Sequence, residues 1–353
     1  MKKVAFIVLA TLLLFACKKE DDKKVEFRAL SFNSIVSDTL EIDSVHMNTF
    51  FSNPTSLFVV DDSLLLVFDD DRSDKLCHFI HTKGYVVKSF GERGRMRGEF
   101  IFPQGLSLSN DKNTCYVYDY NTQYIVCFSV KEALGGGNPV QDVIRMEDVE
   151  SEQPVKHRFY QVLALSNNCF LGFGNDPENR VQIFNKSKIL ATYSDFPALD
   201  ENEENNRSVW GNLASFGISP DEKHVVITTG IGAAFEILSL SGEKISHKLV
   251  KGIYAPKYSI AQGAIPVCVI VCPETVVGFN ALHVANDSFY AVLAGPEERY
   301  NEILQFDFDG ECVHRYCLPS DIAYINCMTI DKGKLWAFVE NKAGEIKLIK
   351  AKI

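Results

Sequence analysis

The chain has 353 residues, a formal net charge of −10 at pH 7 and 46% hydrophobic residues. An acidic chain without basic stripes argues against a nucleic-acid partner, because binding to phosphates depends on clustered lysine and arginine side chains. The apolar and aromatic content is ordinary for a globular protein and is sufficient to bury a large core.

The first 16 residues have the organisation of a bacterial secretory signal peptide. A short positively charged start, residues 1–3, precedes the apolar run 4–15, and Ala16 and Cys17 follow this run. The apolar run is too short to remain in a bilayer as a spanning helix. We therefore expect residues 1–16 to be removed during export.

The end of this segment, Leu14-Phe15-Ala16-Cys17, resembles the lipobox of bacterial lipoproteins. The resemblance implies cleavage before Cys17, diacylglycerol on its thiol and acylation of the new N-terminus. Several acyl chains would hold the protein firmly at a membrane, since each buried CH₂ group contributes about 0.8 kcal/mol. An ordinary cleaved signal peptide, with Cys17 incidental, is the alternative.

The segment 17–24 is expected to be a charged tether, because residues 18–24 (KKEDDKK) are all charged and cannot fold alone. An acidic cluster this close to the cysteine resembles the signal that directs some lipoproteins to the outer face of the outer membrane. A plain soluble linker is the alternative. We expect a lipid-anchored protein of the cell envelope at the outer membrane, in either leaflet.

Units of short strands recur from residue 25 to the end of the chain. Each unit has runs rich in Val, Ile, Phe and Tyr, separated by turns that contain Asp, Gly or Ser. The predicted strands are 56–60, 64–68, 76–80 and 85–90; 106–108, 115–118 and 124–128; 162–165, 170–173, 181–184 and 189–193; 216–218, 224–228, 235–238 and 245–248; 281–284, 288–293, 303–306 and 312–316; 327–330, 335–339 and 346–350. A short helix is expected around residues 130–134.

These units predict an all-β, six-bladed β-propeller of four-stranded antiparallel blades, in a single domain over residues 25–353. The last unit lacks a fourth strand because the chain ends. Either 25–33 or 40–45, near the N-terminus, would supply this strand, close the ring and leave no free sheet edge. A seven-bladed or irregular count is the alternative, because the inserts at 194–214 and 250–278 obscure the boundaries.

One junction between units carries a more specific motif. Residues 91–105, GERGRMRGEFIFPQG, resemble the NHL-type repeat G-x-x-G-x-x-x-G-x-F-x-x-P-x-G. Its glycines permit positive φ angles, Phe100 would pack between blades, and Pro103 would fix the entry to the next inner strand. With the lipobox and the six units, the chain resembles the TolB-like six-bladed propeller lipoproteins, many of which have no assigned activity.

Nine of the ten cysteines remain after Cys17, and their placing favours buried, reduced thiols. An odd number leaves at least one thiol without a disulfide partner in the chain. The seven that lie in strand-like apolar runs are Cys77, Cys115, Cys127, Cys169, Cys268, Cys312 and Cys327. Zinc is the alternative for the pairs at 268/272 and 312/317. The first pair has no histidine nearby, and the second lacks the spacing of structural zinc sites.

The densest cation cluster of this acidic chain, Arg93, Arg95 and Arg97, lies in the NHL-like junction. Loops that enter the inner strands form the ligand-binding face of propellers, and guanidinium groups suit carboxylates. The cluster therefore predicts a patch for an anionic group, such as a uronic acid or a carboxylate-bearing peptide. A solvated turn is the alternative. Trp210, in an insert, would be either a stacking platform for a sugar or a cover of the core.

Three classes of function remain open on the sequence. The first is a non-catalytic binding protein, whose partner is an anionic glycan or an envelope protein. The second is a propeller hydrolase or lyase with calcium in the central channel. The third is a structural subunit of an envelope complex. The chain has no Gly-x-Ser-x-Gly elbow, HExxH motif or phosphate loop, so we favour the binding protein and expect no catalytic residues and no cofactor.

A bound calcium ion is expected only if the protein is a propeller hydrolase or lyase. Some six-bladed relatives hold calcium with Glu, Asn and Asp at the ends of their inner strands. The residues near blade starts that resemble this set are Asn53, Asn280, Asp287 and Asn326, without a glutamate that we assign. A calcium site needs six to eight oxygen ligands, and the sequence does not bring them together.

Overall fold

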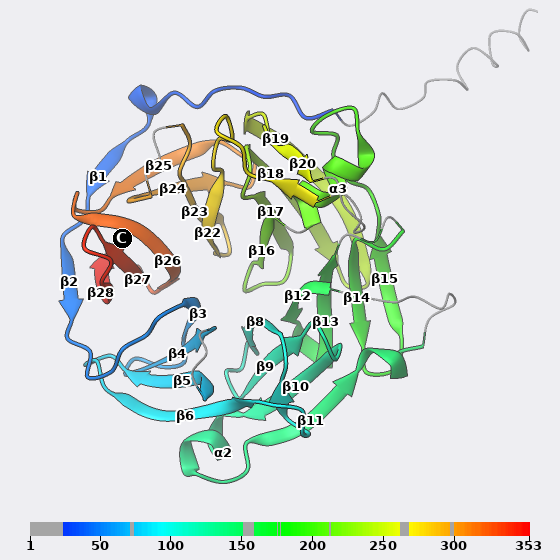
Figure 1. Cartoon of the computed structure of the whole chain (residues 1–353), viewed down its shortest axis with the longest axis vertical. Helices are drawn as coiled ribbons and strands as arrows, with labels where there is room; N and C mark the ends of the chain where they lie inside the picture. Colours follow the sequence, from blue (N-terminus) through cyan, green and yellow to red (C-terminus); the bar gives the residue numbers. More distant parts are fainter. Residues whose placement is uncertain are drawn as a thin grey trace, which may run out of the picture.

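The computed structural model describes residues 24–70, 74–150, 159–174, 176, 178–211, 213–261, 268–296 and 300–353. Six mainly antiparallel sheets in this part are arranged as blades around a central axis (Figure 1). The predicted six-bladed β-propeller of mainly four-stranded blades is therefore confirmed. The predicted signal peptide, Cys17 and residues 18–23 of the tether lie outside the described residues.

The blades follow one another along the chain, each from its innermost strand outward. Blade 1 contains β3 (Pro54–Val59), β4 (Leu64–Asp69), β5 (Lys75–His81), β6 (Val86–Arg93) and the short β7 (Glu99–Phe100). Blade 2 contains β8 (Pro103–Leu108), β9 (Thr114–Asp119), β10 (Tyr124–Ser129) and β11 (Val140–Arg145). Blade 3 contains β12 (Phe159–Ala164), β13 (Cys169–Gly174), β14 (Val181–Asn185) and β15 (Ile189–Tyr193).

The remaining blades repeat this order. Blade 4 contains β16 (Ala214–Ile218), β17 (His224–Thr229), β18 (Ala233–Ser241) and β19 (Lys244–Tyr254). Blade 5 contains β22 (Phe279–Val284), β23 (Ser288–Leu293), β24 (Glu302–Asp307) and β25 (Cys312–Cys317). Blade 6 contains β26 (Ile322–Asp331), β27 (Lys334–Asn341) and β28 (Ile346–Lys352).

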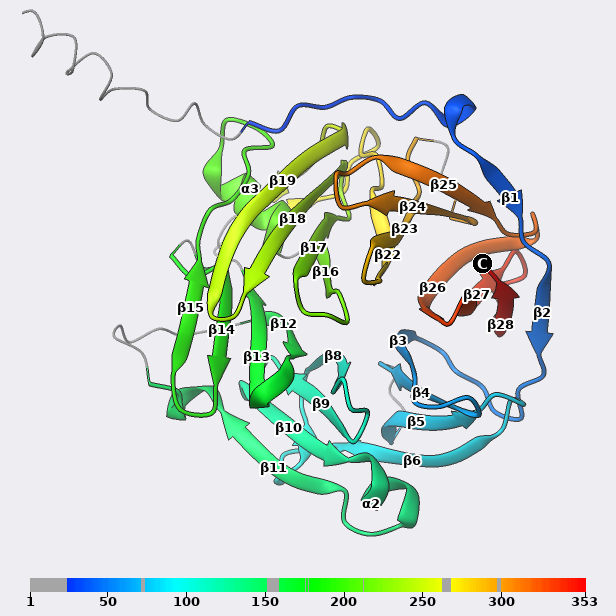
Figure 2. The ribbon, with the colours of Figure 1, turned by 180° about the vertical axis from the view of Figure 1, so that it is seen from behind.

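An N-terminal strand completes blade 6, as predicted. Strand β2 (Ile42–Val45) pairs antiparallel with β28, so 40–45 rather than 25–33 supplies the closing strand. Strand β1 (Ser37–Thr39) pairs in parallel with β25 and widens blade 5. The segment before them follows the outer side of the ring past the short 3-10 helix η1 (Phe32–Ser34), as Figures 1 and 2 show in blue. It makes single backbone contacts with blade 4 and the loop before it, such as Arg28 N to Gly252 O at 2.8 Å.

Several elements between strands were not predicted. Helix α3 (Glu203–Gly211) lies in the insert before blade 4, and the hairpin β20 (Ser259–Ala261)–β21 (Cys268–Ile270) lies in the insert before blade 5. The 3-10 helices η2 (Met146–Asp148) and η3 (Ser166–Asn168) are also additional. Helix α2 (Val130–Gly135) is the predicted short helix, and it separates β10 from the unpredicted strand β11. No helix among the described residues is long and apolar enough to cross a membrane.

The NHL-like motif joins blades 1 and 2 as its residues predict. Phe100 is 1% exposed and lies 6.0 Å from Phe128, ring centroid to centroid, in the apolar cluster between the two blades. Pro103 begins the inner strand β8. Gly98 has a φ of +88°, and a Cβ atom there would lie 2.8 Å from Val140. The motif therefore fixes a close contact that only glycine permits at this position.

Four of the cysteines are buried free thiols: Cys77, Cys115, Cys127 and Cys327. Burial raises the pKa of each thiol, and raises that of Cys127 to about 12. A thiol with so high a pKa is a poor nucleophile and a poor metal ligand. These four cysteines therefore act as small apolar side chains in the blades, as the sequence predicts. The prediction is wrong for Cys169 and Cys312, whose strand positions leave them partly exposed.

Candidate functional site: the central channel

The inner strands leave one edge toward the axis. Each of β3, β8, β12, β16, β22 and β26 is the terminal strand of its sheet, so within the described part its second edge has no strand partner. We call the end of the channel where these strands begin the entry end, and the end where they turn into the second strand of each blade the turn end. The backbone edges therefore offer hydrogen-bonding groups along the channel.

A cavity of about 460 Å³ lies in this channel, and all six blades line it. Such a volume lies in the range of small-molecule sites, about 300–1,000 Å³. Apolar and small polar side chains share its wall. The polar side chains along the strands are Thr55, Ser56, Ser107, Gln161, Ser215, Asn280, His283, Asn326 and Thr329.

Two of these polar side chains link neighbouring inner strands. The hydroxyl oxygen of Ser107 accepts a hydrogen bond from the backbone N–H of Ala164 at 2.8 Å. The side-chain amide nitrogen of Asn280 donates to the carbonyl oxygen of Ile325, also at 2.8 Å. These bonds give hydrogen-bond partners to two backbone groups of the inner strands, the N–H of Ala164 and the carbonyl of Ile325. They also fix the orientation of the Asn280 amide group.

Two acceptor atoms of the wall are buried without a hydrogen-bond partner among the described residues. They are the side-chain oxygens Oδ1 of Asn280 and Asn326, on the adjacent inner strands β22 and β26. Leaving a buried acceptor unpaired costs about 1–3 kcal/mol. Both atoms would gain a partner if a hydrogen-bond donor from the channel reached them through the side chains that cover them.

The wall along the strands carries little charge. His283 lines the cavity, and burial lowers the pKa of its ring to about 4, although Asp331 acts in the opposite direction. The imidazole is therefore neutral at physiological pH. Among the lining residues, Lys112 and Asp331 are charged, and both belong to the turn end.

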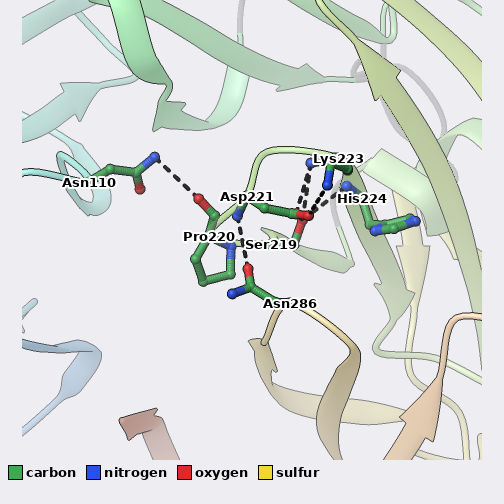
Figure 3. A network of polar contacts seen from close by, with 7 residues as sticks. All are labelled: Asn110, Ser219, Pro220, Asp221, Lys223, His224 and Asn286. Atoms are coloured by element: carbon green, nitrogen blue, oxygen red, sulfur yellow. Dashed lines mark hydrogen bonds and ion pairs between the residues drawn. The ribbon is translucent and has the colours of Figure 1, made fainter. Parts of the chain in front are cut away.

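The turn between β16 and β17 reaches across the turn end (Figure 3). Asn110 in blade 2 donates from Nδ2 to the carbonyl oxygen of Pro220 at 3.4 Å and to Oε1 of Glu222 at 2.6 Å. From the other side, the backbone N–H of Asp221 donates to Oδ1 of Asn286 in blade 5 at 3.0 Å. Because blades 2 and 5 are opposite in a six-membered ring, the blade 4 turn lies across the axis.

Blade 3 joins the same network. Oε1 of Glu222 accepts from the backbone N–H of Ser166 at 2.7 Å and from its hydroxyl at 2.8 Å. The Ser219 hydroxyl is the main cause that lowers the pKa of Asp221 to about 2, and Lys223 adds to it. Turns from four blades thus meet at the turn end. This arrangement favours entry of a ligand from the opposite end.

The three predicted arginines are not among the residues that line the described cavity. Arg93 forms an ion pair of 2.8 Å with Asp70, and both side chains are about one-third exposed. Arg95 and Arg97 are exposed. The neighbouring Gly98 packs against Val140 of β11, the outermost strand of blade 2, so this junction lies toward the rim. Anion binding by the three arginines stays a prediction.

Trp210 is a core residue. Its side chain is fully buried, and its Nε1 donates to the carbonyl oxygen of Pro197 at 2.9 Å. The guanidinium of Arg180 lies 5.2 Å from its ring and forms a fully buried ion pair of 2.7 Å with Glu236. No face of the ring is open to a sugar. This corrects the interpretation of Trp210 as a stacking platform and leaves its role as a cover of the core.

The residues considered for calcium are not brought together. Asn280 and Asn326 line the cavity, whereas Asn53 is exposed before β3 and Asp287 lies in the turn after β22, toward the turn end. Among the described residues, no group of three or more His, Cys, Asp or Glu side chains could hold a metal ion. Sequence reasoning missed Gln161 and His283, although polar residues inside apolar inner strands were a usable signal.

The fold and the site define a six-bladed propeller with a weakly charged central cavity. A family model described as TolB-like 6-blade propeller-like matches residues 31–333, and the chain belongs to this family.

Two solved structures are similar to the chain at low sequence identity. A protein of Bacteroides fragilis NCTC 9343, whose name marks it as a candidate for export, is similar over 94% of this chain and 98% of its own, with 11% identity and a TM-score of 0.57. The WD40 β-propeller domain of Doa1 covers 87% of this chain and 86% of its own, with 11% identity and a TM-score of 0.46. At 11% identity the likeness to the Bacteroides fragilis protein concerns the fold alone. No curated protein matches the sequence.

Proposed function

We propose that the chain is a non-catalytic binding protein of the cell envelope, held at the outer membrane by lipid on Cys17, with its ligand site in the central channel. The observation that carries the proposal is the cavity of about 460 Å³ to which every blade contributes. Its wall combines apolar side chains with a few hydrogen-bonding groups, which is the usual composition of a small-molecule site. The export signal and the lipobox support the location.

The turn end supports entry of the ligand from one side. Glu222 holds the turns of blades 2 and 3 to that of blade 4, and Asn286 holds the same turn to blade 5. A ligand would therefore approach between the loops that precede the inner strands.

The arginine junction provides a second, separate contact for a larger partner. Arg93 is engaged by Asp70, whereas Arg95 and Arg97 extend into solvent near the rim. A carboxylate of an anionic glycan or of an envelope protein would bind there through charge-assisted hydrogen bonds. This contact would add affinity without taking part in recognition inside the channel.

Titration calorimetry of residues 18–353 against neutral glycans, acidic glycans and peptides tests this proposal. The variant Gln161→Trp fills the cavity from β12, and Val87→Trp, at an exposed position of the outer strand β6, is its matched control. We expect Gln161→Trp to abolish binding and Val87→Trp to leave it unchanged, with melting curves that show both variants to be folded. Binding that survives Gln161→Trp but is lost in Arg95→Ala/Arg97→Ala would place the ligand at the rim and contradict the proposal.

Metal analysis of the purified protein, residues 18–353, tests the alternative that the chain is an enzyme. A stoichiometric bound metal, together with a calcium-dependent rise in the melting temperature, would favour a calcium-dependent hydrolase or lyase. In that case lactone and ester hydrolysis would be assayed next.

A further inference from the structure

The side chains of Asn280 and Asn326 give the channel a specific chemical character. Each presents a buried Oδ1 atom without a partner among the described residues, and both line the cavity. They lie on β22 and β26, which are neighbours in the ring. Two unpaired hydrogen-bond acceptors on adjacent blades therefore lie in the wall of one ligand space, and a ligand would reach them by displacing the atoms that cover them.

The orientation of the Asn280 amide is fixed by the protein. Its Nδ2 donates to the carbonyl oxygen of Ile325 at 2.8 Å. Rotating the amide by half a turn would place its oxygen against another oxygen and lose this bond, so Oδ1 is the atom that remains for a ligand. The site at Asn280 thus requires a hydrogen-bond donor.

The charges of the residues that line the cavity indicate whether the hydrogen-bond donor of the ligand is anionic, cationic or uncharged. An anionic group would meet two amide oxygens and a neutral His283, with no cation beside them among the residues that line the strands. A cationic group at the two asparagine oxygens would leave water without a carboxylate beside it, since Asp331, the acidic residue of the lining, lies five residues along β26 from Asn326. Burying an ion without a partner is strongly unfavourable, so an uncharged donor fits best.

The hydroxyl groups of a ligand would also pair with the other hydrogen-bonding groups of the cavity wall. A hydroxyl donates one hydrogen bond and accepts others, so it can pair both with the asparagine oxygens and with backbone N–H groups on the inner edges. Ser56, Ser215 and Gln161 add groups that both donate and accept. A molecule that carries several hydroxyls on a compact frame matches this distribution.

We propose that the channel binds an uncharged, hydroxyl-rich ligand, such as a neutral sugar, whose hydroxyls donate to Oδ1 of Asn280 and Oδ1 of Asn326. This inference rests on the proposed binding site in the channel and names its ligand class. In this proposal the channel and the arginine junction bind different groups. The junction would contact any acidic portion of a longer glycan, outside the cavity.

Calorimetry and thermal melting with named probes test the inference. The probes are glucose, galactose, mannose and N-acetylglucosamine, their uronic acids where these exist, a short acidic peptide, and calcium chloride alone. At least one neutral sugar should bind. Asn326→Leu should weaken that binding about tenfold or more, because one hydrogen bond is lost and the oxygen is replaced by an apolar group. Asn326→Asp, which keeps the acceptor oxygens, should retain more of the affinity than Asn326→Leu.

Each other outcome is decisive. Binding in the channel by uronic acids or the peptide alone, blocked by Gln161→Trp, would overturn the ligand class and leave the binding site intact. A shift with calcium alone would also overturn it. Equal affinity of Asn326→Leu and the wild type for a neutral sugar would refute the role of Asn326. If no probe of any class is blocked by Gln161→Trp, the proposed site itself fails together with this inference.

Discussion

The side-chain nitrogen of Asn110 in blade 2 lies 2.6 Å from Oε1 of Glu222 in blade 4, although the two residues are 112 positions apart. The same oxygen accepts two hydrogen bonds from Ser166 in blade 3. One carboxylate thus ties three blades together at the turn end. Glu222 holds this position with a φ of 57°, a conformation that is uncommon for residues other than glycine.

Removing the carboxylate should loosen the turn end. Glu222→Ala loses the bonds to Asn110 and Ser166, and we expect the unfolding free energy to fall by about 1–2 kcal/mol because the site is exposed. Glu222→Gln keeps an acceptor oxygen and should lose less. Hydrogen exchange of the amides in 219–224 measures the effect. Unchanged exchange in Glu222→Ala would show that other contacts hold the turn.

Ring closure depends on strand β2. A chain of residues 46–353 lacks β2 and exposes the edge of β28, whereas a chain of residues 41–353 keeps it. We expect the shorter chain to melt at least about 5 °C lower and to associate through the free edge. The longer chain, which like the shorter one lacks β1, serves as the matched control and should associate less in light scattering. Equal melting of both chains would show that three strands suffice for blade 6.

The buried ion pair between Arg180 and Glu236 should be costly to break on one side. Both side chains are fully buried, and the atoms Nη1 and Oε2 lie 2.7 Å apart. Arg180→Met leaves the carboxylate unpaired in the core, and we expect a loss of about 3–5 kcal/mol in urea unfolding. The double variant Arg180→Met/Glu236→Leu removes both charges and should recover most of that loss. A double variant no better than the single one would contradict this account.

Acid should destabilise the fold through His283. Burial lowers the pKa of His283 from 6.5 to about 4, so the unfolded chain binds more protons than the folded one between these values. The stability that the neutral ring provides is complete above pH 6.5 and is lost as the pH falls toward 4. We expect the unfolding free energy to be lower at pH 5 than at pH 7.5 by at most about 2 kcal/mol from this group.

The variant His283→Gln isolates this contribution. Burial also lowers the pKa of His78 and of His224, so part of the pH dependence belongs to them and has the same sign. His283→Gln should therefore reduce the difference between pH 5 and pH 7.5 without removing it. An unaltered difference would show that protonation of His283 does not limit stability in acid.

Local patterns made most of the fold predictable. The alternation of strand-like runs and turns gave the blades, the glycines and Phe100 of the NHL-like motif gave one inter-blade junction, and the unpaired last unit required an N-terminal strand. Strand β11 was missed because its sequence, VQDVIR, mixes polar and apolar residues and follows a helix and three glycines. Helix α3 was missed because its first half is acidic and polar.

The site was less predictable because it depends on contacts between distant residues. Arg93, Arg95 and Arg97 stand out by charge density, but only the packing of Gly98 on β11 places their junction toward the rim. Trp210 stands out by residue type, but the buried Arg180 beside it lies 30 positions earlier in the chain. The unpaired oxygen of Asn280 follows from its bond to Ile325, which requires the register of two blades.

The most direct test of a ligand site in the channel is nuclear magnetic resonance of residues 18–353 with ¹⁵N-labelled asparagine, titrated with the neutral sugars named above. Single substitutions at Asn280 and Asn326 assign their side-chain amide signals. We predict that a binding sugar shifts both signals in a saturable manner, and that Gln161→Trp abolishes the shifts. Saturable binding that leaves both signals unmoved would contradict a ligand site in the channel.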